Sequence, residues 1–468
     1  MQAPEVLPPA ERGMQTPEAA GATITPLTLE VVTQSAATMY PGLEAALREM
    51  DIAQGKETSA WGEFDLKAKA DSIAGPMGFY KNYRTGVKLE QATMPGGLVY
   101  GQYRIGDGSF PTWYGERETN EGGEFKVGYL ASLLQGRAID PRRAAIFQAQ
   151  LRQEQVEPAV QVIVLDIVFA ASDVYWSWVA AGASRRVQQN LLDFTRERNR
   201  IYEIRVQNKD LAPIELVQNE RLLASRQAKL YEAERKLQQS AIKLSLFLRD
   251  PTGRGVVPSA AALPRALVRP KDRRSQTVEE DIALAQSSRP ELRELNVIQR
   301  QVELDRQLAT NQTLPSLDAG FDASKDVGAQ ASSKGDKTPF ELEAGLYFEM
   351  PLQRRKAYGK IREADGKLAQ LGAKRRLTED KIAIEVRDAV NAIQLASDRA
   401  RQTEVGVRTA KELVDAERLR LDNGDSDLLR VAIQEASAIE AELADIEALA
   451  DYWKAEAALR AALGILPP

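Results

Sequence analysis

The chain has 468 residues, a formal net charge of −5, and neither Cys nor His. The missing Cys excludes disulfides and thiolate metal sites, and the missing His removes the commonest general base and metal ligand. The chain has no excess of basic residues, so its composition does not favour nucleic-acid binding. We therefore expect neither an enzyme nor a cofactor-binding or nucleic-acid-binding protein. Aromatic residues make up only 6% of the chain, a composition that favours long helices over a large compact core.

Residues 1–26 are rich in Pro, Ala and Glu and are expected to form a flexible leader. They lack the basic and apolar regions of a signal peptide. The numbering therefore starts on a processed or engineered form, or the protein is not exported. The best apolar run, residues 159–171, is interrupted by Gln161 and Asp166 and is too short for a transmembrane helix. No helix is expected to cross a membrane.

Two halves of the chain repeat one pattern. RVQNKDLAPIELVQNERLLAS starts at Arg205, and RLDNGDSDLLRVAIQEASAIE starts at Arg420 and aligns with it without gaps. FKVGYLASLLQGR and FELEAGLYFEMPLQRR form a second matching pair. Each half is expected to run helix, strands, long helix, turn and helix. Two copies are too few for a stacked array, so the pattern indicates a duplicated protomer.

The predicted boundaries follow from this repeat. The first repeat is residues 27–250 and the second is residues 286–468, with a separate segment at residues 251–285. In the first repeat we expect strands in 64–134, a long helix over 137–207, a hairpin tip at 208–215 and a returning helix over 213–249. In the second repeat we expect strands in 316–352, a long helix over 355–422, a tip at 423–430 and a returning helix over 427–464.

The long helix of the second repeat has a heptad seam of apolar or small residues. Its members are Ile382, Val386, Ala389, Ile393, Ala396, Ala400, Val407, Ala410 and Val414. At 1.5 Å per residue, such a helix would be on the order of 100 Å long. An ordinary two-stranded coiled coil is one interpretation. The small seam residues favour the other, in which many helices pack side by side in a wide tube.

The strand segments alternate between an apolar and a charged face. In residues 340–350 the charged face carries Glu341, Glu343 and Glu349, and in residues 317–323 it carries Asp318 and Asp322. Strands of roughly 9–11 residues with this pattern are typical of a barrel that crosses a bilayer around a wet lumen. A half-buried sheet of a soluble protein is the alternative, but it would leave open edges and an exposed apolar face.

Four strands cannot close a barrel alone, whereas three protomers with four strands each could. Residues 87–106 read as an additional hairpin around Met94, Pro95, Gly96 and Gly97. This hairpin either rises above the barrel on the extracellular side, which we favour, or adds strands to the wall.

The motifs together resemble the TolC outer-membrane efflux family, over nearly the whole chain. LLQGRAIDPRRAAI and MPLQRRKAYGKI resemble its two strand-into-helix passages, and DVYWSWVAA resembles its aromatic signature. The resemblance implies an α+β membrane protein, a trimeric 12-stranded transmembrane β-barrel continued by a long periplasmic α-helical barrel. It places the protein in the outer membrane of a Gram-negative bacterium, with residues 251–285 in an equatorial belt.

The resemblance also implies function and partners. The homotrimer would serve as the passive exit channel of a tripartite efflux or type I secretion system. Its partners would be a periplasmic adaptor (membrane fusion) protein, an inner-membrane pump or ABC transporter, and outer-membrane lipid. A soluble coiled-coil scaffold is the alternative function.

The two hairpin tips are the candidate site for gating and adaptor contact. The residues concerned are Asn208, Asp210, Glu215, Asn423, Asp425, Asp427, Arg430 and Ile433. Asp210 in one tip, and Asp425, Ser426 or Asp427 in the other, are candidate N-caps. The candidate lumen residues are Asp318, Asp322, Glu341, Glu343 and Glu349.

In the family, acidic side chains narrow and gate the mouth. Glu215 falls on such a position, but Arg430 and Ile433 stand where carboxylates are expected. Glu215 and Arg430 could pair between neighbouring hairpins and close the mouth, or both could face water. On the strands, Lys67, Lys69, Lys88 and Lys126 counter the acidic residues of the lumen.

Overall fold

The computed structural model describes residues 25–110, 118–270, 276–331 and 340–465. The expected leader thus lies outside the described residues except for its last two positions. The chain divides into two compact units, each containing segments of both sequence repeats. The first unit is Met1–Ser35, Ala171–Pro270 and Arg399–Asp451, and the second is Ala36–Ala170, Lys271–Asp398 and Tyr452–Pro468.

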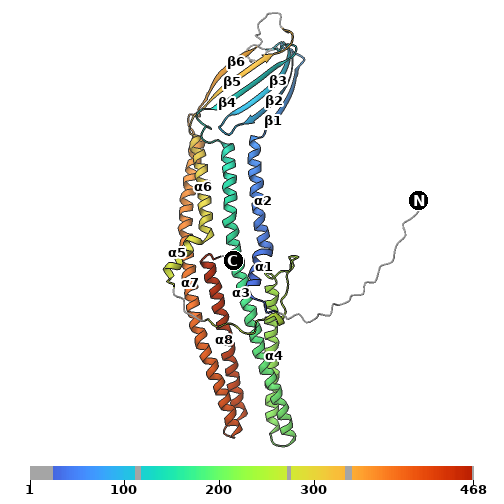
Figure 1. Ribbon diagram of the computed structural model, residues 1–468, viewed down its shortest axis with the longest axis vertical. Helices are drawn as coiled ribbons and strands as arrows, with labels where there is room; N and C mark the ends of the chain where they lie inside the picture. The colour runs from blue at the N-terminus through green and yellow to red at the C-terminus, as the bar shows by residue number, and fades with distance from the viewer. Residues whose placement is uncertain (1–24, 111–117, 271–275, 332–339, 466–468) are drawn as a thin grey trace, which may run out of the picture. The chain divides into compact units, whose positions relative to one another are not determined.

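The second unit contains one antiparallel sheet whose six strands follow each other in chain order (Figure 1). The strands are β1 (Lys67–Gly75), β2 (Asn82–Ala92), β3 (Leu98–Gly108), β4 (Glu124–Ser132), β5 (Ser316–Asp326) and β6 (Glu341–Glu349). Each pairs only with its chain neighbours, so among the described residues β1 and β6 are the two edges. Both repeats contribute to the sheet, because β4 of the first pairs with β5 of the second.

The hairpin of residues 87–106 is part of this sheet. It forms most of β2 and β3, which lie between β1 and β4, so the expectation that it stands above the barrel is wrong. The count of four strands per protomer, on which the 12-stranded barrel rested, is corrected to six for the described residues. The physical reason is that Val87 and Leu89 alternate with Lys88 and Glu90 in register with the neighbouring strands.

Helices of both repeats form the core of the second unit. Its own helices are α2 (Pro41–Trp61), α5 (Val278–Ser288) and α6 (Pro290–Asn311), and parts of the longer α3 (Pro141–Gln207), α7 (Arg355–Asp422) and α8 (Leu428–Ala462) join them. Thr277 and Glu280 form a capping box that starts α5. Residues of α5, α6, α7 and α8 build one apolar cluster, which includes Ala285, Leu292, Leu295, Ile382, Val386, Ala389, Ile393 and Leu459.

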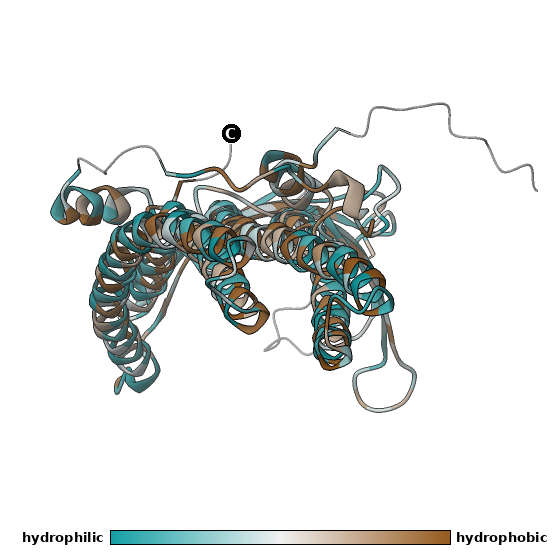
Figure 2. Ribbon diagram, turned by 90° about the horizontal axis from the view of Figure 1, so that it is seen from below, coloured by the Kyte–Doolittle hydropathy of each residue, from teal (hydrophilic) through white to brown (hydrophobic). Residues whose placement is uncertain are grey.

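The first unit contains α4 (Pro213–Leu244) and the remaining parts of α3, α7 and α8. Trp178, Leu192 and Leu244 are fully buried there. Hydrophilic and hydrophobic residues alternate along the helices in Figure 2, as expected when a helix packs along one stripe. α1 (Leu29–Met39) begins in this unit, and Leu27 just before it accepts a 2.9 Å hydrogen bond from the hydroxyl of Tyr175.

The predicted small-residue seam of α7 is largely buried. Ile382 and Ala400 are 1% exposed and Val386 is completely buried. Because Ala and Val are short, neighbouring helices can approach closely along this seam. The seam therefore packs against other helices of the chain within each unit.

One of the described helices is long and apolar enough to cross a membrane by length and composition. An 18-residue window in α3 has a mean hydropathy of 1.6, with 28% of the window buried. Length and composition alone do not make α3 a membrane-spanning helix, so the expectation that no helix crosses a membrane stays a prediction. A core helix of a water-soluble protein satisfies the same criterion, so the finding carries no further weight.

Candidate functional site

The sheet of the second unit has two chemically different faces. Residues that are paired across two strands have their side chains on the same face, so the strand register shows on which face each side chain lies. One face is apolar and exposed, with Val87, Leu89, Val99, Val127, Phe321, Leu342, Leu346 and Phe348. The opposite face carries all the charged strand residues except Asp107 and Lys325, which lie near the strand ends. One surface therefore suits hydrocarbon and the other suits water.

All five candidate lumen residues lie on the polar face. Asp322 pairs with Glu343 between β5 and β6, and Asp318, Glu341 and Glu349 have the same orientation. Their alternation with apolar neighbours was the signal that identified them. The register brings them onto one surface but does not test their role.

The basic residues of this polar face are confined to β1–β4, where acidic residues accompany them. β1 to β4 carry Lys67, Lys69, Asp71, Arg84, Lys88, Glu90, Arg104, Glu124 and Lys126. β5 and β6 carry only acidic charges on this face, namely Asp318, Asp322, Asp326, Glu341, Glu343 and Glu349. The two groups meet at Lys126, whose Nζ lies 3.3 Å from the Asp322 carboxylate and 3.9 Å from that of Glu343.

A polar contact crosses β4 on this face. Tyr100 of β3 donates a hydrogen bond to Asp322 of β5, although β3 and β5 are not neighbours in the sheet. Gly128 of β4 lies between them in the register. A Cβ at Gly128 would overlap the ends of both side chains, so any larger residue there would displace this contact. The contact ties β3 to the second repeat.

The two hairpin tips have the same backbone turn. At the end of α3, Asp210 N–H bonds to Arg205 O at 2.8 Å and Lys209 N–H to Val206 O at 3.0 Å. The end of α7 repeats both bonds, from Asp425 to Arg420 and from Gly424 to Leu421. These are the two bonds of a Schellman motif. The left-handed residue is Lys209 in the first tip (φ 65°) and Gly424 in the second (φ 82°).

Only one candidate N-cap has that role. Asp427 Oδ1 accepts a 2.8 Å hydrogen bond from the backbone of Arg430 at the start of α8. Asp210 does not cap α4, whose N-cap is Ala212 with no side-chain bond. The reason is Pro213 at the first helical position, which already removes one unsatisfied N–H donor.

The charged candidates at the tips are accessible. Arg430 lies 3.7 Å from Asp427 in its own tip, with 59% of its side chain exposed. Ile433 is 56% exposed, Glu215 is partly exposed, and Asn208 and Asn423 are exposed. The described residues of this single chain include no Glu215–Arg430 ion pair.

A charged cluster missed by the sequence analysis lies behind the tips, in the first unit. Glu435 of α8 is 4% exposed and accepts bonds from Arg198 of α3 (3.0 Å), Arg226 of α4 (3.3 Å) and Arg418 of α7 (3.2 Å). One carboxylate therefore connects the two helix hairpins. The repeat does not predict this cluster. Glu220, which is equivalent to Glu435 in the first repeat, is exposed and belongs to no such cluster among the described residues.

Arg198 and Arg226 both pair with Glu435, whereas Arg418 also lies 3.9 Å from Asp415 of its own helix. Arg226 is 4% exposed and also donates to Thr195. Burial lowers the pKa of Arg226, and the Arg198 charge acts in the same direction, whereas Glu435 opposes both. Loss of the Glu435 charge would leave Arg226 and Arg198, whose side chains are 4% and 13% exposed, without this carboxylate, whereas Arg418 is 38% exposed.

Comparison with known proteins identifies the fold. Residues 282–465 match the model of the outer membrane efflux protein family. The resemblance inferred from the sequence is confirmed, and so is the outer-membrane location that it implied.

Solved outer-membrane channels share the fold over nearly the whole chain. VceC of Vibrio cholerae is 17% identical, with a TM-score of 0.66, and the match covers 93% of this chain and 96% of VceC. CmeC of Campylobacter jejuni is 14% identical (TM-score 0.64, 97% and 94% covered). The open state of the MtrE channel of Neisseria gonorrhoeae is 14% identical (TM-score 0.64, 95% and 93% covered). No curated protein matches the sequence.

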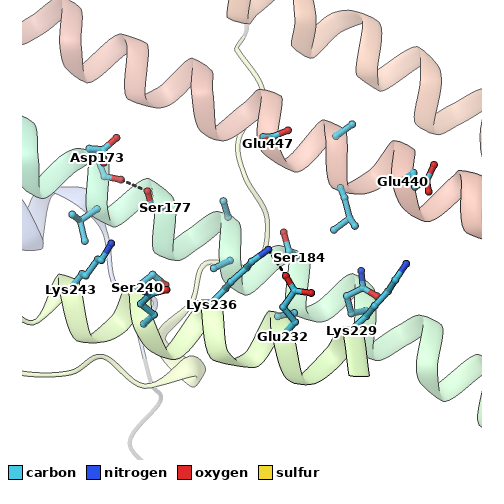
Figure 3. A pocket seen from close by; sticks show the side chains of 18 residues that line it. Asp173, Ser177, Ser184, Lys229, Glu232, Lys236, Ser240, Lys243, Glu440 and Glu447 are labelled. Atoms are coloured by element: carbon cyan, nitrogen blue, oxygen red, sulfur yellow. Dashed lines mark hydrogen bonds and ion pairs between the residues drawn. The ribbon is translucent and has the colours of Figure 1, made fainter. Parts of the chain in front are cut away.

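The first unit has a hollow of about 780 Å³. Figure 3 shows Lys229, Lys236 and Lys243 of α4 on one side and Glu440 and Glu447 of α8 on the other. Lys236 pairs with Glu232 of its own helix at 3.0 Å. The floor between these side chains is α3. No group of three or more metal-ligating side chains occurs among the described residues.

Proposed function

We propose that this outer membrane efflux protein is a trimeric channel that gives substrates a passive exit from the periplasm to the exterior. It works in a tripartite efflux or type I secretion system of a Gram-negative bacterium. A periplasmic adaptor and an inner-membrane pump or ABC transporter supply selection and energy. The chain itself contributes no catalytic chemistry.

The observation that carries this proposal is the two-faced sheet. Its exposed apolar face would be unfavourable in water but suits lipid, and its charged face suits a water-filled lumen. Two open strand edges cannot remain in the hydrocarbon region, because each unpaired backbone group costs several kcal/mol there. Several copies must therefore join edge to edge around the charged face.

The helix tips form the gated periplasmic mouth of the proposed channel. Asn208, Asp210, Glu215 and their counterparts in the second tip line the mouth or contact the adaptor. Glu435 and its three arginines act behind them as the clamp between the two hairpins. Opening requires the hairpins to separate, and this ion cluster resists separation because its charges are largely removed from water.

Reconstitution tests the proposal. The protein purified in detergent should be a trimer and should produce ion-conducting steps in planar lipid bilayers. A monomeric particle that needs no detergent and shows no conductance would instead support the soluble coiled-coil scaffold. Far-UV circular dichroism adds a check, since that scaffold would lack the β component.

A further inference from the structure

We infer that three copies of this chain close a transmembrane barrel of eighteen strands, by pairing β6 of each copy with β1 of the next. This inference rests on the proposed trimeric channel and deepens it. The partner at each sheet edge is a second copy of the chain. The β2–β3 hairpin supplies the six strands beyond twelve.

The β2–β3 hairpin has the properties of barrel wall. Its eleven-residue strands are paired along their length with β1 and β4. Val87, Leu89 and Val99 are 44–47% exposed on the apolar face. Lys88, Glu90 and Arg104 lie on the polar face with the charged residues of the other strands. A hairpin in water would gain nothing from an apolar face in register with its neighbours.

The strand number allows closure without a parallel pair. Neighbouring strands in the sheet are antiparallel throughout, so β1 and β6, with four strands between them, run in opposite directions. Two copies placed edge to edge therefore also pair antiparallel. Every backbone edge is then satisfied, as a lipid-embedded sheet requires.

The stagger of the sheet matches a barrel with tilted strands. Followed across the paired rows, Lys67 of β1 lies in the row of Glu343 of β6. From that row β1 extends toward Gly75, while β6 extends the opposite way to Glu349. For β1 of the next copy to pair along the full length of β6, it must be shifted by about six residues from its row in its own sheet. The barrel then slips by about six residues for every six strands. With 3.3 Å per residue and 4.8 Å between strands, this slip gives a tilt of about 35°, at the lower end of the usual range.

The two edges are complementary in charge and size. That slip places Glu349 opposite Lys67 on the polar face. Within its own chain, Lys67 pairs with Glu63 at 3.1 Å. On the apolar face β1 carries the small residues Ala68, Ala70, Ser72 and Ala74. β6 offers the large residues Leu342, Leu346 and Phe348, which are 65–76% exposed. Large residues of one edge then cover small residues of the other.

Barrel diameter grows roughly linearly with strand number, so eighteen strands give a lumen about half again as wide as twelve. Side chains cannot fill a barrel of that size, and an aqueous channel remains. The membrane section would then be wide, and the helix tips would set the resistance of the closed channel.

Cysteine cross-linking tests the seam, since the chain contains no native Cys. A double variant with Glu349→Cys and Lys67→Cys, oxidised in membranes, should run as a covalent trimer in denaturing, non-reducing gels. A second pair, Glu349→Cys with Lys69→Cys, should cross-link instead if the slip between copies is eight residues rather than six. The matched control combines Glu343→Cys with Lys67→Cys, which share a row, and should stay monomeric. Covalent dimers as the largest species, or monomers from both test pairs, overturn the inference.

Fluorescence quenching tests the hairpin separately from the oligomer. A bimane label on Val87→Cys should be quenched several-fold more by nitroxide lipids than by aqueous iodide, and a label on Lys88→Cys should show the reverse. If iodide quenches both labels equally, the hairpin stands in water and the inference fails.

Electron cryomicroscopy of the full chain in detergent counts the strands directly. Eighteen strands around a threefold axis support the inference. A conducting trimer with twelve strands overturns it while leaving the proposed channel function intact, whereas a non-conducting monomer overturns both.

Discussion

The carboxylate of Glu435 accepts a 3.0 Å hydrogen bond from Arg198 and so joins α8 to α3. Arg226 and Arg418 bond to the same carboxylate from α4 and α7. One buried anion thus contacts both helix hairpins, and Arg418 also stacks over the ring of Phe194 of α3. Four helices thus depend on one charge, and this dependence can be tested.

Glu435→Gln should loosen the first unit and open the mouth. Breaking a buried ion pair by removing one partner costs about 3–5 kcal/mol, because the remaining charges are left uncompensated. We expect a lower thermal unfolding midpoint and a several-fold higher single-channel conductance. Glu220→Gln is the matched control, since Glu220 occupies the equivalent repeat position but is exposed. Equal behaviour of the two variants would contradict the clamp.

Glu215→Ala or Arg430→Ala should also raise conductance in planar bilayers if the two side chains form a closing belt between neighbouring hairpins. An exposed pair contributes at most about 1 kcal/mol, so each effect should be smaller than that of Glu435→Gln. Arg221→Ala, which removes an exposed arginine of α4, serves as the control. Conductance unchanged from the parent would remove both residues from the gate.

Lys209→Gly should stabilise the first tip. Lys209 has φ 65°, a left-handed conformation that costs a non-glycine residue roughly 1 kcal/mol. The reciprocal change, Gly424→Lys, should destabilise the second tip by a similar amount, because Gly424 has φ 82°. Amide hydrogen exchange at Asp210 and Asp425 reports each turn separately. Faster exchange at Asp210 in Lys209→Gly would refute the strain argument.

Tyr175→Phe should make the protein less sensitive to alkali. Burial raises the pKa of Tyr175 to about 12, above its unfolded value of roughly 10. The folded state therefore holds the proton more tightly, and the stability that this contributes is complete below pH ~10 and lost as the pH rises toward 12.

Near-ultraviolet absorbance of tyrosinate during alkaline titration measures this change. The variant should lose one late-titrating phenol and the 2.9 Å bond to Leu27. Tyr231→Phe is a control on an exposed side chain. An unchanged late titration in Tyr175→Phe would assign that phenol to another tyrosine.

The sequence reveals local periodicity well in this protein. The long helix expected over residues 355–422 is α7, and the repeat offset that aligns Arg205 with Arg420 also relates the starts of α4 at Pro213 and α8 at Leu428. Helical seams and alternating strands are visible because each side chain's environment is set by its own helix or strand.

The wrong placement expected for residues 87–106 shows that local periodicity does not reveal which strands pair with each other. Their alternation correctly indicates two strands, but pairing partners lie on other segments. β2 pairs with β1 as well as β3, and only that pairing makes the hairpin part of the sheet. The Glu435 cluster was missed for the same reason, because Arg198 and Arg226 lie 237 and 209 residues before Glu435 in the chain.

The sequence by itself determined the duplicated plan, the two-faced strands, the small-residue helix seams and the family. These properties are local, since they depend on the period of one helix or strand and the chemistry of its faces. Only the tertiary structure decided that six strands share one sheet with β1 and β6 at its edges, and that one buried carboxylate joins four helices. Such features depend on contacts between distant segments, and those contacts leave no periodic trace in the sequence.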